Sequence, residues 1–220
     1  MKRKKMSALL MTSLCLLGTA CSSDDNITPK EELNQLTTEA RSFLTDNIVL
    51  NVRAFMGEAD KTLLPDGCPV IFDFKWSDTH NTNTLNIAML DFTMEGMPYV
   101  IDRFACDLTI ASLNSWEQDE YKGDGWIKFE GKDGWLKMVS DIPNIPTIDK
   151  QIEGSSIMGY YNVRTHEINF KIDFNQMLVT ATAIRQTVDK SRLAKFDEEK
   201  KQYEEEFEKY KEEHGLNKKE

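Results

Sequence analysis

Residues 167–174 read Glu-Ile-Asn-Phe-Lys-Ile-Asp-Phe, and this stretch decides the fold. Apolar side chains occupy every second position, and polar side chains fill the positions between them. A period of two is that of a β-strand, whose successive side chains point to opposite faces of a sheet. Because one face is apolar and the other polar, the stretch predicts an antiparallel strand with Ile168, Phe170, Ile172 and Phe174 turned into a core.

Other segments have the same character. Val70–Trp76 and Leu85–Leu90 also alternate, and five less regular segments have the composition of strands. No helical periods alternate with these strands, so the sequence predicts a mainly β protein whose antiparallel meander closes as a barrel or folds as a sandwich. The five further predicted strands are Ile48–Phe55, Tyr99–Phe104, Cys106–Ala111, Ile157–Val163 and Met177–Ile184.

A short repeat predicts the register of one hairpin. The pattern Asp-Gly-Trp-apolar-Lys occurs at residues 124–128 and again at 133–137. Asp133-Gly134 has the composition of a two-residue primed turn. A hairpin around this turn places charge opposite charge and apolar opposite apolar, with Glu130 facing Lys137 and Phe129 facing Met138.

Two helices are expected to flank the strands. Thr28-Pro29-Lys30-Glu31 has the pattern of a capping box with proline at the first helical position, and the helix is expected to continue to about Leu44. Lys and Glu dominate the chain from Lys190 to His214, where aromatic residues follow an a/d heptad stripe. This second helix is predicted to dock on the barrel, or to pair with a second chain or a partner. Its predicted partner face is Phe196, Tyr203, Phe207 and Tyr210, with Lys200 interrupting the stripe.

The chain begins with the three parts of a secretion leader: four cations, an apolar stretch over residues 7–17 and the small residues 18–20. Cys21 follows, and this order resembles a bacterial lipoprotein signal, which implies cleavage before Cys21 and lipid attachment to its thiol. The polar residues 22–26 resemble the export tags of surface lipoproteins of Bacteroidetes. The expected division is a leader over 1–20, a tether over 21–28, a barrel domain with an N-terminal helix over 29–186 and a charged C-terminal helix over 187–220.

A second resemblance concerns the strands. A strand over residues 84–91, the stretch 92–98 and a strand from Tyr99 are similar to calycin-like lipoproteins of Bacteroidetes, as is the region from Glu153 to Phe174. The resemblance extends over about residues 47–186 and implies a lipocalin-type barrel in a secreted protein. It brings no catalytic or ligand-binding residue with it, and it includes neither of the predicted flanking helices.

Composition limits the partners and the redox chemistry. The chain has 27 Lys and Arg against 37 Asp and Glu, and four of these cations lie in the leader, which leaves a formal charge of −14 on the rest. This charge argues against nucleic acid and against direct docking on anionic lipid, so the lipid on Cys21 is the expected membrane bond. Cys68 and Cys106 remain, and a secreted protein can carry them as a disulfide or as buried free thiols.

No catalytic motif is present, and two cysteines with three scattered histidines do not form a metal site, so no cofactor is expected. The first hypothesis is a non-enzymatic binding or accessory lipoprotein, anchored in the bacterial outer membrane at the cell surface, that holds an apolar small molecule inside its barrel. The alternatives are a spacer that recruits a protein partner through the C-terminal helix and, less favoured, a surface glycan hydrolase. The candidate pocket lining is Phe72, Phe74, Phe170 and Phe174, unless these rings fill the interior, and the candidate carboxylates are Asp119, Glu120, Asp124 and Glu130.

Overall fold

A computed structural model describes residues 28–76, 84–95, 97, 99–140, 142–176 and 178–216. The predicted leader, its lipid site at Cys21 and nearly all of the tether lie outside the described residues. None of the helices in the described part of the chain combines the length and the apolarity needed to cross a bilayer.

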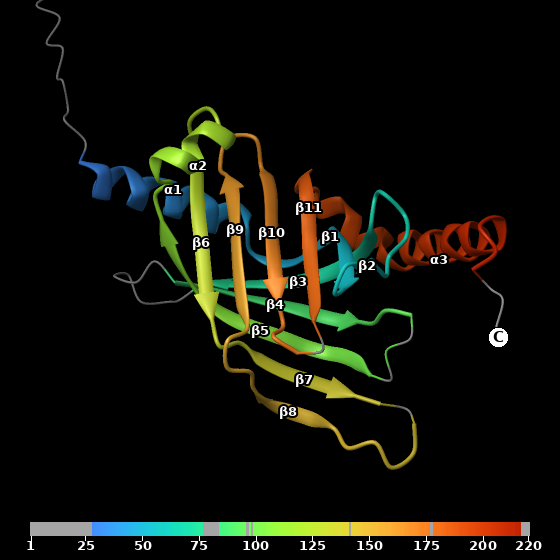
Figure 1. Cartoon of the computed structure of the whole chain (residues 1–220). Helices are drawn as coiled ribbons and strands as arrows, with labels where there is room; N and C mark the ends of the chain where they lie inside the picture. Colours follow the sequence, from blue (N-terminus) through green and yellow to red (C-terminus); the bar gives the residue numbers. More distant parts are fainter. Residues whose placement is uncertain are drawn as a thin grey trace, which may run out of the picture.

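Eight antiparallel strands form a closed barrel, which confirms the mainly β prediction and excludes the sandwich (Figure 1). The strands follow the order β4-β3-β1-β11-β10-β9-β6-β5, and pairing of β4 with β5 closes the ring. Full closure leaves no open edge in the ring itself, which removes the usual route to edge-to-edge aggregation. The barrel strands are β1 (Asp46–Met56), β3 (Cys68–Trp76), β4 (Thr84–Phe92), β5 (Val100–Ala111), β6 (Trp126–Lys132), β9 (Ser156–Asn162), β10 (Glu167–Asp173) and β11 (Val179–Thr187).

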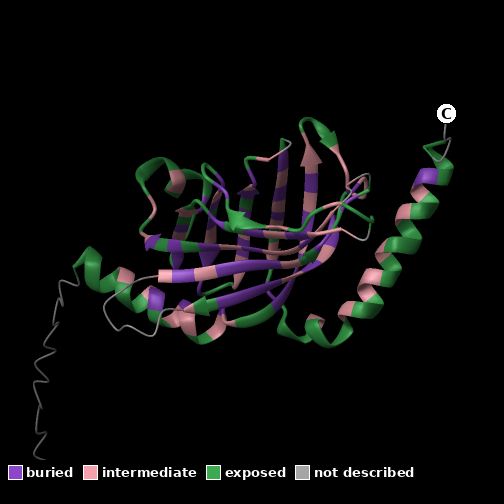
Figure 2. Cartoon of the chain, turned by 90° about the horizontal axis from the view of Figure 1, so that it is seen from below, coloured by how far each residue is buried: buried purple, intermediate pink, exposed green. Residues whose placement is uncertain are grey.

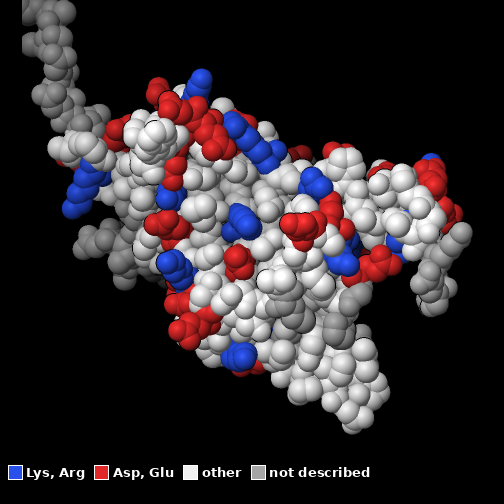
Figure 3. All heavy atoms as spheres, viewed as in Figure 1, with Lys and Arg blue, Asp and Glu red and all other residues white. Residues whose placement is uncertain are grey.

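Three further strands lie outside the ring. The two-residue strand β2 (Ala59–Asp60) pairs with the end of β1, and β7 (Trp135–Val139) pairs with β8 (Ile148–Gln151). The β7–β8 hairpin projects beyond the barrel in Figure 1, and Figure 3 shows no charged atoms among the described residues of its tip. Neither β2 nor β8 was predicted, because both are short and lack a clear period of two.

The predicted hairpin at Asp133-Gly134 is wrong. β6 and β7 do not pair with each other; they lie one after the other along the same edge of β5, which is one continuous strand rather than the two predicted. The chain bends between them at Asp133, which has φ +57°, and just before it Gly131 in β6 lies so close to β5 that an added Cβ would be 2.1 Å from the carbonyl oxygen of Asp107. Residues 152–155 hold the bend, since the N–H of Gly154 donates to the Asp133 carboxylate at 2.7 Å and the N–H of Gly134 donates to the Ser155 hydroxyl at 2.9 Å.

The inward face of β10 is the one predicted from residues 167–174. Ile168, Phe170, Ile172 and Phe174 are at most 2% exposed, and their polar neighbours point outward. Buried and exposed positions alternate around the other strands in the same way (Figure 2). The core of the protein therefore lies inside the barrel.

Helix α1 (Pro29–Phe43) closes one end of the barrel. The predicted capping box is present, since the Thr28 side chain accepts from the N–H of Glu31 while the Glu31 carboxylate accepts from the N–H of Thr28. Ala40 and the following Leu44 are fully buried, and the Trp76 indole N–H donates to the carbonyl of Leu44 at 2.6 Å. The remaining helical segments are α2 (Ser115–Glu120), the 3-10 helix η1 (Lys190–Lys195) and α3 (Phe196–Glu213).

Candidate functional site

A groove separates α3 from the barrel, and we call it the α3 groove. It has a volume of about 290 Å³. Its floor comes from the start of β3, the end of β4 and the loop after β4, where Val70, Phe92 and Met94 are at most 7% exposed. Charged side chains surround this apolar floor: Lys61, Asp91, Glu95, Lys200, Glu204, Glu208 and Lys211 also line the groove. An apolar surface with convergent polar groups is the composition of a small-molecule site.

One face of α3 forms the opposite wall of the α3 groove. Three residues of the predicted partner face, Phe196, Tyr203 and Phe207, lie on this wall and are half-buried against the protein's own barrel. These three are therefore not a free surface for a partner. The same wall carries Lys200 and Lys211, and Lys61 adds a third cation from the barrel side.

Tyr210, the fourth predicted partner residue, does not line the α3 groove. It stacks on His214 instead, with 3.9 Å between the ring centroids. Lys211 takes its place at the far end of the wall, where its ammonium lies 4.9 Å from the centroid of the Phe207 ring. The prediction assumed a repeat of 3.5 residues, whereas an α-helix with 3.6 residues per turn drifts about 20° per heptad from that repeat.

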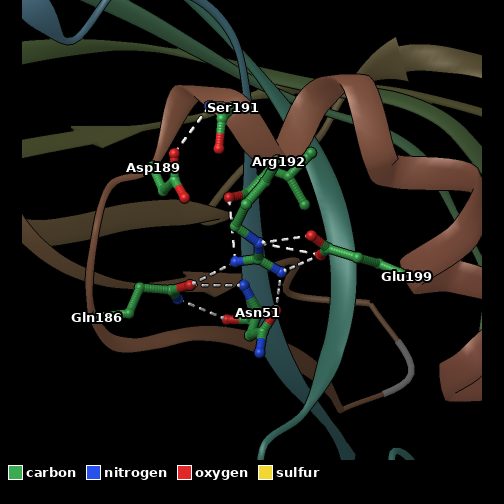
Figure 4. Close-up of polar contacts among 7 residues, drawn as sticks. Asn51, Gln186, Asp189, Ser191, Arg192 and Glu199 are labelled. Carbon is green, nitrogen blue, oxygen red and sulfur yellow. Dashed lines mark hydrogen bonds and ion pairs between the residues drawn. The ribbon is translucent and has the colours of Figure 1, made fainter.

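Arg192 fastens the N-terminal end of this segment to the barrel (Figure 4). Its guanidinium donates to both carboxylate oxygens of Glu199 on α3, at 2.6–3.3 Å, and to the side-chain oxygen of Asn51 on β1 at 2.6 Å. Gln186 on β11 joins the cluster, because its side-chain oxygen accepts from the N–H of Asn51 at 2.9 Å. Asp189 caps η1 by accepting from the N–H of Ser191. We call these residues the Arg192 cluster; they tie η1 and α3 to two barrel strands.

Two more contacts join α3 to the barrel further along the helix. The Tyr203 hydroxyl donates to the carbonyl of Thr62 at 3.1 Å, and Thr62 is itself held by the carboxylate of Asp60. Near the C-terminal end, the Lys211 ammonium lies 3.0 Å from the carboxylate of Glu95 in the loop after β4. Hydrogen bonds from this ammonium to Glu208, which has the larger effect, and to Glu95 raise the pKa of Lys211 above its ordinary value.

The comparisons with known proteins place the chain in one family. Residues 21–215 match the family described as Domain of unknown function (DUF4903). The chain belongs to the DUF4903 family. No curated protein and no solved structure matches it. The DUF4903 description carries no enzymatic activity, so the chemistry of the domain has to be argued from its own residues.

The disulfide considered for Cys68 and Cys106 is absent, and both thiols are free and buried in the DUF4903 domain. Cys106 on β5 lies opposite Ile87 on β4, and Ile87 lies opposite Phe74 on β3. Phe74 is six residues along β3 from Cys68. Six residues of strand span about 20 Å, whereas bridged cysteines have Cα atoms within about 7 Å. Cys68 instead lies in the floor of the α3 groove, where burial raises the pKa of its thiol to about 12.

The pocket predicted inside the barrel is also wrong, because its four rings fill the interior. Phe72, Phe74, Phe170 and Phe174 are 2% exposed or less, so almost no ring surface is accessible to water. Phe170 packs edge-on against Phe72, with 5.0 Å between the centroids, and Phe174 packs in the same way against Phe104 at 4.9 Å. These contacts stabilise the core, and the cavity that Phe174 lines has a volume of only about 10 Å³, too small for an organic ligand.

The candidate carboxylates of the hydrolase hypothesis come from a short helix, a turn and a barrel strand. Asp119 and Glu120 are exposed on α2, and Asp124 is exposed in the turn before β6. Glu130 lies on the outer barrel wall, where it pairs with Lys128 at 3.1 Å. Within the described ranges, no group of three or more His, Cys, Asp or Glu could hold a metal ion.

Sequence reasoning missed most residues of the α3 groove. The floor residues Val70, Phe92 and Met94 have the composition of any core position. The one available signal was Lys200, a cation at a position of the stripe that the repeat reserves for an apolar residue. Arg192 gave no signal, because its partners are 141 residues away on β1 as well as seven residues away on α3.

Proposed function

We propose that this DUF4903 protein is a lipid-anchored binding lipoprotein of the bacterial outer membrane, exposed at the cell surface and held there through Cys21. The order of cations, apolar stretch, small residues and cysteine at the start of the chain supports the anchor. The closed barrel is consistent with the resemblance to calycin-like lipoproteins of Bacteroidetes. In this proposal the protein binds an apolar small molecule and catalyses no reaction.

The observation that carries the proposal is the contrast between the filled barrel and the α3 groove. The four aromatic rings inside the barrel are at most 2% exposed and the cavity beside Phe174 has about 10 Å³, whereas the groove has about 290 Å³ above an apolar floor. That volume is close to the lower limit of small-molecule sites. The binding site is therefore expected outside the barrel, between Phe207 on α3 and Phe92 on β4.

A fluorescence titration with N-phenyl-1-naphthylamine, an uncharged apolar dye, tests this proposal. The protein is used without its leader and with Cys21→Ser, so that it is soluble. The dye is expected to gain emission on binding, and Phe207→Glu is expected to reduce its affinity at least tenfold by placing a charge on the groove wall. Leu193→Glu is the matched control, because it also replaces an apolar residue of this segment but lies outside the groove lining. Absence of binding, or equal binding by wild type and Phe207→Glu, contradicts the proposal.

The two other hypotheses have less support. Recruitment of a partner through the C-terminal stripe conflicts with Phe196, Tyr203 and Phe207 facing the barrel. Glycan hydrolysis requires two carboxylates on either side of a scissile bond, and the candidate acids occupy a short helix, a turn and a paired position on the outer wall. Neither hypothesis has a second observation in its favour.

A further inference from the structure

Helix α3 crosses the α3 groove and is fastened to the barrel at three places. The Arg192 cluster holds its N-terminal end, the Tyr203 hydroxyl meets the Thr62 carbonyl in the middle, and Lys211 meets Glu95 near the C-terminal end. Figure 2 shows α3 running at an angle to the barrel with most of its surface exposed. The helix therefore depends on a few polar contacts rather than on a broad apolar interface.

The two ends of α3 are fastened with different strength. Arg192 makes a bidentate ion pair whose side chains are 21% and 26% exposed, and it bonds to β1 and β11 in addition. The Lys211 ammonium is only 9% exposed, but its one contact with the barrel side is with Glu95, whose side chain is 55% exposed, and its other partner is Glu208 on α3 itself at 2.7 Å. Bidentate arginine contacts are the strong class, whereas a single lysine contact with a largely exposed carboxylate is weaker and more open to screening by salt.

The change from the 3-10 helix η1 to the α-helix α3 lies inside the Arg192 cluster. It occurs at Lys195, whose side chain makes no capping hydrogen bond, and the Arg192–Glu199 ion pair spans it. A 3-10 turn is a common connector at the start of an α-helix, so this cluster is the point about which the rest of α3 can swing. Because a single helix of 18 residues is only marginally stable by itself, its position depends on the contacts it makes with the barrel.

We propose that α3 is a strap, hinged at the Arg192 cluster and latched by Lys211 on Glu95, which opens to admit the ligand of the α3 groove. Admission of a ligand rests on the function proposed above, whereas the hinge and the latch rest on the contacts of α3 alone. Opening would break the latch and the Tyr203 contact while the Arg192 cluster stays in place. The floor of the groove, including Cys68, would then become accessible.

The two free cysteines of the domain provide the test. Without the leader and with Cys21→Ser, Cys68 and Cys106 are the two thiols left in the chain. Cys68 lies under α3 in the groove floor, whereas Cys106 lies on β5 and does not line the groove. Labelling with N-ethylmaleimide, quantified at each cysteine by mass spectrometry, therefore separates opening of α3 from general unfolding.

Lys211→Met keeps the aliphatic stem against Phe207 and removes the latch charge. It is expected to raise the labelling rate of Cys68 about two- to fivefold and to leave Cys106 unchanged, which is the effect of losing one ion pair with a largely exposed carboxylate. Glu95→Gln is expected to act in the same way. Lys209→Met is the matched control, since Lys209 pairs with Glu213 on α3 itself and its variant should label like wild type. Raising NaCl from 0.05 to 1 M should speed labelling of Cys68 in wild type but not in Lys211→Met.

An unchanged Cys68 rate in Lys211→Met and Glu95→Gln overturns the strap, and so does a parallel rise at both cysteines. The dye titration separates this result from failure of the proposed function. If Cys68 responds to the latch variants but N-phenyl-1-naphthylamine never binds, the strap stands and the ligand proposal is wrong. If the dye binds but Cys68 is labelled at the same rate in wild type and in the latch variants, the groove is a site and the strap is wrong.

Discussion

Replacing Phe170 by alanine tests whether the barrel interior is packed core. The side chain is 2% exposed and lies between the rings of Phe72 and Phe129, with centroids at 5.0 and 5.9 Å. A buried phenylalanine removes about 150–250 Å² from water, which at about 25 cal/mol per Å² corresponds to roughly 4–6 kcal/mol. Alanine retains part of this area, so the expected loss in the free energy of unfolding is about 3–5 kcal/mol.

Urea unfolding of the Cys21→Ser protein, followed by circular dichroism, measures this loss. With an m-value of about 2 kcal/mol per M, the midpoint should fall by about 2 M while m itself stays unchanged. Trp116→Ala is the control, because Trp116 is 83% exposed on α2 and its removal should change stability by no more than about 0.5 kcal/mol. A loss below about 1 kcal/mol for Phe170→Ala would refute the packed interior, since only a ring beside open space can be removed so cheaply.

Three further predictions concern the close approach of β6 to β5, the thiols and the anchor. Gly131→Ala should destabilise the protein by about 2–3 kcal/mol in the same urea assay, because its Cβ would meet the Asp107 carbonyl; wild-type stability would show that the two strands are not in close contact there. Burial raises the pKa of the thiols of Cys68 to about 12 and of Cys106 to about 11, from 9.0 in the unfolded chain, so their contribution to stability is complete below pH 9 and is lost as pH rises toward 12. As pH rises from 9 to 11, the free energy of unfolding should therefore fall less steeply in the variant with both cysteines replaced by alanine than in wild type. Equal slopes in the two proteins would contradict this effect. Cys21→Ser in the full-length chain should move the protein from the membrane to the soluble fraction, and retention in the membrane without incorporation of labelled fatty acid would contradict a lipid anchor.

The sequence predicted the parts of the fold that depend on local pattern. The alternation over residues 167–174 identified a strand and the face it buries, and the capping box at Thr28 identified the start of α1. Both signals come from neighbouring residues, so tertiary structure could not easily override them. Counting such strands left a barrel or a sandwich, and the resemblance to calycin-like lipoproteins favoured the barrel that the structure has.

The errors arose where the structure depends on distant contacts. Asp133-Gly134 has turn composition, but the loop at residues 152–155 and the edge of β5 determine how the chain bends there. The heptad stripe correctly indicated a helix but left open whether it docks on the barrel or pairs with a second chain or a partner, and only the barrel surface decides that Lys211 rather than Tyr210 faces it. The disulfide hypothesis failed for the same reason, because strand register and not sequence separation determines the distance between Cys68 and Cys106.

The most direct test of the central claim, that ligand binds under α3 and not inside the barrel, is a methyl NMR titration of the Cys21→Ser protein with N-phenyl-1-naphthylamine. The claim predicts shift changes at Val70, Leu90 and Met94, which line the α3 groove, and none at Ile157 or Ile172, which are fully buried in the barrel. Changes centred on Ile157 and Ile172, with the groove methyl groups unaffected, would contradict it.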